Sequence, residues 1–150
     1  MAKSELQNRI HDEMKTAMRA KDKPRLGIIR LIQSEFKRIE VDERIDLDEA
    51  RVLAVLDKMV KQRRDSAKQY EDADRQELAD QEHFEITIIT EFLPQALTEE
   101  EIVTLIDDAV TATSASSMQD MGKVMGILKP QLQGRADMGA VSKLIKAKLV

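Results

Sequence analysis

Few side chains in this sequence could carry out catalysis. His11 and His83 are the only histidines, and neither has a second histidine one helical turn away to form a metal-binding pair. The chain has no cysteine, and its serines near position 115 lie in a connecting segment without the surroundings of a nucleophile. The acidic residues are spread along helix faces, so no two of them form an acid–base pair. We therefore expect no independent catalytic activity, no metal site and no cofactor.

The residues best suited to binding lie between Asp120 and Val150. This stretch holds four of the five glycines and carries a net charge of +4, although the whole chain has a net charge of −4. A glycine inside a helix costs about 1 kcal/mol relative to alanine. A chain that keeps several such glycines usually needs its backbone close to a neighbour. The question is which neighbour this is.

Gly122 and Gly126 form a strip on one side of a helix predicted to begin at residue 120, because they lie four residues apart. Lys123 flanks this glycine strip on one side and Lys129 on the other. Two neighbours fit such a bare surface: another helix at close approach, or the phosphate backbone of a nucleic acid. Spacing alone favours the helix. Pro130 is expected to end or kink this helix, because it has no amide hydrogen to donate.

A tight joint at residues 134–139 is predicted to connect this helix to the last one. Gly134 is a candidate for the left-handed residue that follows a helix, and Asp137 is a candidate N-cap for the next. Lys143 and Lys146 lie three residues apart on the last helix and point outward together.

The elements that must position these residues read as helices throughout. Apolar residues recur at helical spacing, and no segment shows the period-two alternation of a strand, so we predict an all-α protein. An N-terminal helical bundle at residues 1–95 is followed by a small three-helix domain at residues 96–150. Asp46 is predicted to cap the third helix and Thr98 the fifth, each with a glutamate three residues on, and Ser117 the sixth. Pro94 ends the fourth helix.

The third and fourth predicted helices carry opposite charges. Residues 58–68 hold five cations and one anion, whereas residues 71–91 hold eight anions and one cation. This pattern suggests an antiparallel pair with complementary surfaces, joined near residues 72–74. Solvated helix faces are the simpler interpretation of both charge runs.

Composition narrows the class of protein further. No apolar run is long enough to cross a membrane, so we expect a cytoplasmic protein without membrane contact. The chain has three phenylalanines, one tyrosine and no tryptophan, which disfavours a site that stacks bases on aromatic rings.

Three segments carry a resemblance to a known family: KQRRDSAKQY, EFLPQALTEEEI and the tail DMGKVMGILKPQLQGRADMGAVSKLIKAKL. They resemble the GatB/YqeY family, in its free-standing YqeY-like form, over essentially the whole chain. The family implies an all-helical bundle followed by a small helical domain. Its related region is the tail of the B subunit of the glutamine-dependent aspartyl/glutamyl-tRNA amidotransferase, where it is implied to help hold tRNA. Carried onto this chain, the resemblance implies a tRNA surface made of Gly122, Lys123, Gly126, Lys129, Gly134, Arg135, Lys143 and Lys146.

The catalytic part of that enzyme has no counterpart in this sequence. A carbon–nitrogen ligase label, with glutamine as amido donor, would therefore be inherited from the fused relative. Two functions stay open. The first is a non-catalytic accessory module that binds tRNA weakly through backbone contacts, or binds a tRNA-handling protein. The second is a protein–protein adaptor that docks a partner through the basic third helix and the glycine strip. The sequence does not specify the oligomeric state.

Overall fold

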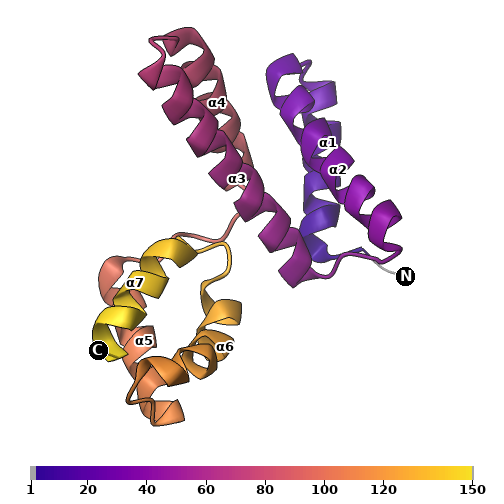
Figure 1. The fold of residues 1–150 in the computed structure, drawn as a ribbon. Coiled ribbons are helices and arrows are strands. Elements are labelled where there is room, and N and C mark those ends of the chain that lie inside the picture. Colours follow the sequence, from indigo (N-terminus) through magenta and orange to yellow (C-terminus); the bar gives the residue numbers. More distant parts are fainter. Residues whose placement is uncertain (1–2, 150) are drawn as a thin grey trace. The chain divides into compact units, whose positions relative to one another are not determined.

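A computed structural model describes residues 3–149 of the chain. These residues form seven α-helices, one 3-10 turn and no strand, which confirms the predicted all-α class. No helix among them is long and apolar enough to cross a membrane. The elements, drawn in Figure 1, are α1 Glu5–Arg19, α2 Lys23–Glu43, α3 Glu49–Asp72, α4 Gln76–Thr90, α5 Glu99–Thr113, η1 Met118–Asp120, α6 Met121–Leu132 and α7 Met138–Leu149.

Contacts between residues divide the chain into two compact units, and the boundary between them lies between Leu93 and Pro94. Unit 1 holds α1 to α4 and unit 2 holds α5 to α7, and each has its own buried core. The sequence predicted a boundary at residues 95 and 96. That each unit folds as an independent domain stays a prediction.

Two helical hairpins, α1–α2 and α3–α4, make up unit 1. Ser4 caps α1 with a complete capping box, in which its hydroxyl accepts from the Gln7 amide and the Gln7 side chain accepts from the Ser4 amide. Asp22 caps α2 by accepting from the Arg25 amide. The core of unit 1 is aliphatic except for Phe36 and Phe92.

The predicted cap of α3 at Asp46 is wrong. Asp48 is the N-cap, and its carboxylate accepts from the Arg51 amide at 2.8 Å. The helix begins later because Leu47 first enters the core, where only 2% of it is exposed. Leu47 and Val52 are then buried on either side of the cap, the arrangement of a hydrophobic staple.

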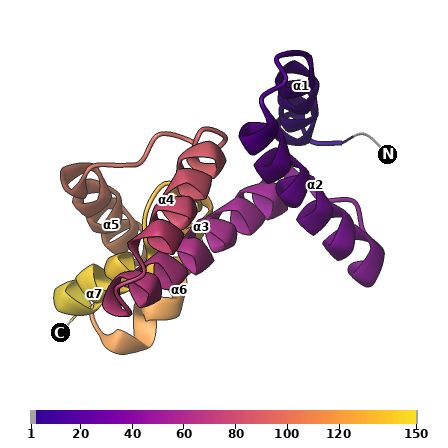
Figure 2. The same cartoon turned by 90° about the horizontal axis from the view of Figure 1, so that it is seen from above.

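α3 and α4 lie side by side as an antiparallel pair in both views, Figures 1 and 2. Arg63 of α3 and Glu85 of α4 form an ion pair with 3.2 Å between Nε and Oε2, and both side chains are mostly buried. The Nε hydrogen is not aimed at a hydrogen-bond acceptor, so this contact is electrostatic. Glu71 and His83 make a second, exposed contact at 2.8 Å. The antiparallel pair is as predicted, but only Arg63–Glu85 has the predicted polarity, since Glu71 belongs to α3 and His83 to α4. The other cations of residues 58–68 are exposed, as the simpler interpretation of solvated helix faces expects.

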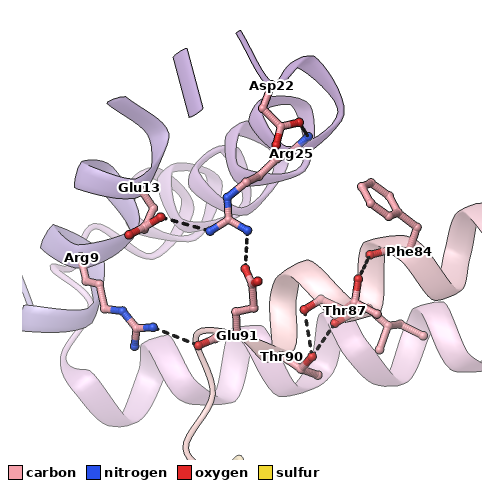
Figure 3. Close-up of polar contacts among 9 residues, drawn as sticks. Arg9, Glu13, Asp22, Arg25, Phe84, Thr87, Thr90 and Glu91 are labelled. Carbon is pink, nitrogen blue, oxygen red and sulfur yellow. Dashed lines mark hydrogen bonds and ion pairs between the residues drawn. The ribbon is translucent and has the colours of Figure 1, made fainter. Parts of the chain in front are cut away.

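A guanidinium cluster ties the first hairpin to the end of α4, as Figure 3 shows. Arg25 of α2 pairs with Glu13 of α1 at 3.1 Å and with Glu91, the residue that caps α4. Arg9 donates to the Glu91 carbonyl at 3.1 Å and lies 5.4 Å from the centre of the Phe92 ring. Three helices of unit 1 are thereby held at one point.

In unit 2, three helices surround a core that includes Val124, Leu128, Val141 and Ile145. Thr98 caps α5 as predicted and accepts from the Glu101 amide at 3.2 Å. Of the two outcomes predicted at Pro130, the end of the helix is wrong, because α6 continues to Leu132. A kink at Pro130 stays a prediction.

Candidate nucleic-acid interface

The glycine strip of α6 faces open space. Gly122 and Gly126 are exposed, and a Cβ atom built on either would meet no heavy atom within 4 Å. The opposite side of the helix is core, since Val124 and Leu128 have no exposed surface. Within unit 2, as described to residue 149, no helix is therefore packed on the strip. Helix packing inside unit 2 does not account for these two glycines.

Both lysines that flank the strip are available to a ligand. The Lys123 side chain is 71% exposed, and its Nζ lies 3.9 Å from Asp120 Oδ1. An exposed ion pair of this length contributes at most about 1 kcal/mol, so Lys123 can exchange it for another anion. Lys129 is exposed in the last turn of α6 and makes no ion pair within residues 3–149.

Asp120 positions the start of α6, a role that the sequence reasoning missed. Its Oδ2 accepts from the Ser116 amide at 3.0 Å, and this hydrogen bond lowers the pKa of the Asp120 carboxyl. Ser117, the predicted cap, makes no side-chain cap bond; instead its carbonyl accepts from the Asp120 amide at 3.0 Å. The signal in the sequence was an aspartate directly before a helix and shortly after two serines.

The joint between α6 and α7 has the predicted caps. Gly134 has φ 77° just after the C-cap of α6, a left-handed conformation that favours glycine, and it is buried. Asp137 Oδ1 accepts from the Gly139 amide at 3.0 Å and caps α7. Because Gly134 is buried, it shapes the joint and offers little surface of its own to a ligand.

Arg135 is held by unit 2 itself. Its Nε donates to the Gln95 carbonyl at 3.3 Å, and its own carbonyl accepts from the Leu97 amide at 2.9 Å. These bonds join the α6–α7 joint to the segment before α5. Arg135 therefore has a structural role, whatever it contributes to binding.

The last helix supplies two more free cations. Lys143 and Lys146 are exposed on α7 and make no ion pair within residues 3–149. Lys148, by contrast, pairs with Asp107 of α5. We refer to the available cations of unit 2 as the C-terminal lysines, which are Lys123, Lys129, Lys143 and Lys146.

The histidines and the acidic residues are the other side chains of the described chain that could take part in chemistry. Within residues 3–149, no three His, Asp or Glu side chains converge in a way that could hold a metal ion. His11 Nδ1 lies 3.4 Å from Gln33 Nε2, and His83 is paired with Glu71. Both histidines are exposed.

The structure thus gives an all-helical chain whose second unit carries an exposed glycine strip and exposed lysines without ion pairs in residues 3–149. The sequence pattern of the family described as Yqey-like protein matches residues 7–149, so this chain belongs to the YqeY family, which is related to the tail of GatB.

One curated relative extends this finding to a fungal protein. The chain is 28% identical over 141 residues to "Altered inheritance of mitochondria protein 41, mitochondrial" of Pyrenophora tritici-repentis. The match covers 92% of this chain and 77% of the relative. The relative's name assigns that protein to mitochondria, and the cytoplasmic location expected for this chain stays a prediction.

Proposed function

We propose that this protein is a non-catalytic accessory module that binds structured RNA, tRNA in the first place, through unit 2. The single observation that carries the proposal is the glycine strip of α6, which is exposed, has no side chain of described unit 2 packed on it and lies between two available lysines. A sugar-phosphate backbone fits such a surface, because phosphates can reach the lysines while the strand passes over helix backbone.

The contact is expected to depend on shape and charge rather than on base sequence. Structured RNA exposes its phosphates and 2′-hydroxyls, and reading unpaired bases usually requires aromatic rings. The only phenylalanines and the only tyrosine lie in unit 1, so unit 2 has no ring on which to stack a base. Membership of a family related to the GatB tail also favours tRNA as the ligand.

The experiment is a gel-shift or filter-binding titration of the full chain with total tRNA at about 50 and 200 mM salt. Each lysine that neutralises a phosphate contributes about 0.7 to 0.9 to the slope of log affinity against log salt. The quadruple variant Lys123→Ala, Lys129→Ala, Lys143→Ala, Lys146→Ala should therefore lose about three units of slope and most of its affinity. Arg135 is left intact, because its substitution would also break the side-chain bond to the Gln95 carbonyl.

A matched control removes the same charge elsewhere, in the variant Lys15→Ala, Lys58→Ala, Lys61→Ala, Lys68→Ala. These lysines of unit 1 are exposed and make no ion pair within residues 3–149. The control should keep most of the affinity. Equal losses in both variants would show attraction by net charge alone, and an unbound wild-type chain at low salt would refute the proposal.

The adaptor remains a second candidate because of one side chain. Ile127, directly after the glycine strip, is 38% exposed, and protein interfaces favour an apolar centre. A protein partner on the strip would lose affinity with Ile127→Ser, whereas binding to phosphates would not change. Unchanged tRNA affinity in this variant therefore favours RNA over the adaptor.

A further inference from the structure

α2 carries a second cationic surface, on the side opposite its buried face. The buried face holds Ile29, Ile32 and Phe36. Lys23, Arg30 and Lys37 follow one another at intervals of seven residues, so on an α-helix they drift by only about 20° per step. All three are exposed. We call these three residues the α2 stripe.

Small residues separate the cations of the α2 stripe. Gly27 lies between Lys23 and Arg30, and Ser34 lies between Arg30 and Lys37. Both are exposed, and a Cβ atom built on Gly27 would meet nothing within 4 Å. The helix backbone between the cations is therefore accessible, as it is along the glycine strip of α6.

Glu40 is the α2 carboxylate nearest the stripe: it follows Lys37 by three residues and lines a hollow together with Lys37 and Asp46. No carboxylate of α2 lies between the cations of the stripe. Glu35 and Asp42 fall on another side of the helix, where both pair with Arg38 at 2.5 and 3.3 Å. The three residues of the α2 stripe make no ion pair within residues 3–149. Exposed carboxylates among these cations would neutralise the positive charge of the α2 stripe, and α2 has none between them.

The outer face of α3 differs in this respect, although it carries as many cations. Lys61, Arg64 and Lys68 are exposed there, but Asp65 lies next to them on the same face of the helix. α3 therefore offers a cationic set of the same composition, two lysines and one arginine, with a carboxylate directly beside its cations.

We infer that the α2 stripe binds the sugar-phosphate backbone of the same structured RNA, as a second contact on unit 1. This inference rests on the proposed function and extends it to α2. Seven residues of helix rise about 10.5 Å, which is wide enough for successive cations to meet different phosphates of one strand. Successive cations of the stripe can thus each meet a phosphate.

A membrane or an apolar protein surface fits the α2 stripe less well. A helix that lies on a membrane must expose a broad apolar face, but the apolar face of α2 is buried in the core of unit 1. The exposed apolar residues of α2, Leu31 and Val41, stand ten residues apart and form no patch.

The test compares two charge-matched variants of the full chain in the tRNA titration. Lys23→Ala, Arg30→Ala, Lys37→Ala should weaken binding roughly 10- to 100-fold and lower the salt slope by about 2 to 3. Lys61→Ala, Arg64→Ala, Lys68→Ala removes the same charge from α3 and should stay close to wild type. Equal effects of the two variants would overturn the inference.

Gly27→Glu provides an independent check, because it removes no cation. The built Cβ position is open, so the helix accommodates a side chain there, and the new carboxylate lies among the stripe cations. Weaker tRNA binding with unchanged helicity supports the inference. Wild-type binding by the stripe variants, together with loss of binding in the C-terminal lysine variant, would overturn it and leave the proposed function standing.

Two further outcomes are decisive. A wild-type chain that does not bind tRNA even at low salt would overturn both proposals. Loss of binding to vesicles of anionic phospholipid in the stripe variant, with tRNA binding unchanged, would assign the α2 stripe to a membrane surface and overturn the RNA inference.

Discussion

Gly126 is a residue that the proposed function uses and that the fold of α6 does not require. It occupies the interior of α6, where glycine is unfavourable, and the chain gains no close contact from it. Gly134 differs, because its φ of 77° requires glycine for the fold itself. The sequence pointed to both glycines. Only the structure shows that the backbone conformation requires glycine at 134 and not at 126.

Substituting Gly126 by alanine should stabilise the chain by about 1 kcal/mol, because alanine favours the helix and the added methyl group meets open space. Gly134→Ala should destabilise it by about 1 to 2 kcal/mol, since a Cβ atom is strained at positive φ. Urea denaturation of both variants measures the difference. A destabilised Gly126→Ala would mean that the strip is packed against part of the fold.

Glu35 makes the stability of unit 1 depend on pH. The hydrogen bond from Arg38, with Nη2 2.5 Å from Oε1, lowers the pKa of Glu35 below its ordinary value of 4.5. A carboxylate with a lowered pKa stabilises the fold above pH 4.5, and this contribution disappears as the pH falls through the lower folded-state value.

Glu35→Gln should therefore cost about 0.5 kcal/mol at pH 7 and nothing at low pH. Urea denaturation between pH 2 and 7 would show the two stability curves converging in acid. Glu99→Gln, at an exposed residue without an ion pair within residues 3–149, serves as the control and should keep the wild-type pH dependence. Parallel curves for Glu35→Gln would contradict the assignment.

The structural role of Arg135 could not be predicted from the sequence. Its charge and its place in a glycine-rich joint suggested a ligand contact. Its bond to the Gln95 carbonyl joins residues 40 apart in the chain, and no local pattern could indicate that.

At the scale of elements, α6 shows how burial can outweigh a helix breaker. Pro130 removes the bond that its amide would donate to the Gly126 carbonyl, at a cost of about 3 kcal/mol. Val124, Leu128 and Leu132 are fully buried on one side of the helix, and each contributes about 1.5 to 3 kcal/mol. The sequence predicted the helix from periodicity but could not weigh the proline against tertiary packing.

The pairing of α3 with α4 should depend on the Arg63–Glu85 ion pair. Glu85→Gln leaves the mostly buried Arg63 charge without its counter-ion and should cost about 2 kcal/mol. Glu77→Gln, which breaks the exposed pair with Arg75, should change the free energy of unfolding by less than about 0.5 kcal/mol. Thermal or urea unfolding ranks the two variants. Equal effects would show that this ion pair does not stabilise the hairpin.

At the scale of the whole molecule, the charge runs predicted the α3–α4 pair, and periodicity predicted the all-α class. Cap positions were predicted less well, because Leu47 enters the core before α3 can begin. The availability of the C-terminal lysines could not be predicted either, since it depends on which cation meets a carboxylate from another helix, as Lys148 does with Asp107.

Cutting the chain between Leu93 and Pro94 tests the two-domain prediction. Each unit has a separate core, so each piece should remain helical and soluble alone. Unit 2 is expected to be the less stable, because a smaller domain buries a smaller fraction of its surface. Circular dichroism during thermal melting of both pieces measures this. An unfolded or aggregated unit 2 would show that it depends on unit 1.

The most direct measurement of the central claim is the tRNA affinity of Gly126→Leu beside that of wild type, at one fixed salt concentration. This substitution removes no charge, and the Cβ position at Gly126 is open, so we expect the fold and the C-terminal lysines to stay in place. If an RNA backbone lies on the glycine strip, the leucine side chain blocks its approach, and affinity should fall at least about tenfold. Unchanged affinity in a folded Gly126→Leu would contradict the claim that the strip is the contact surface.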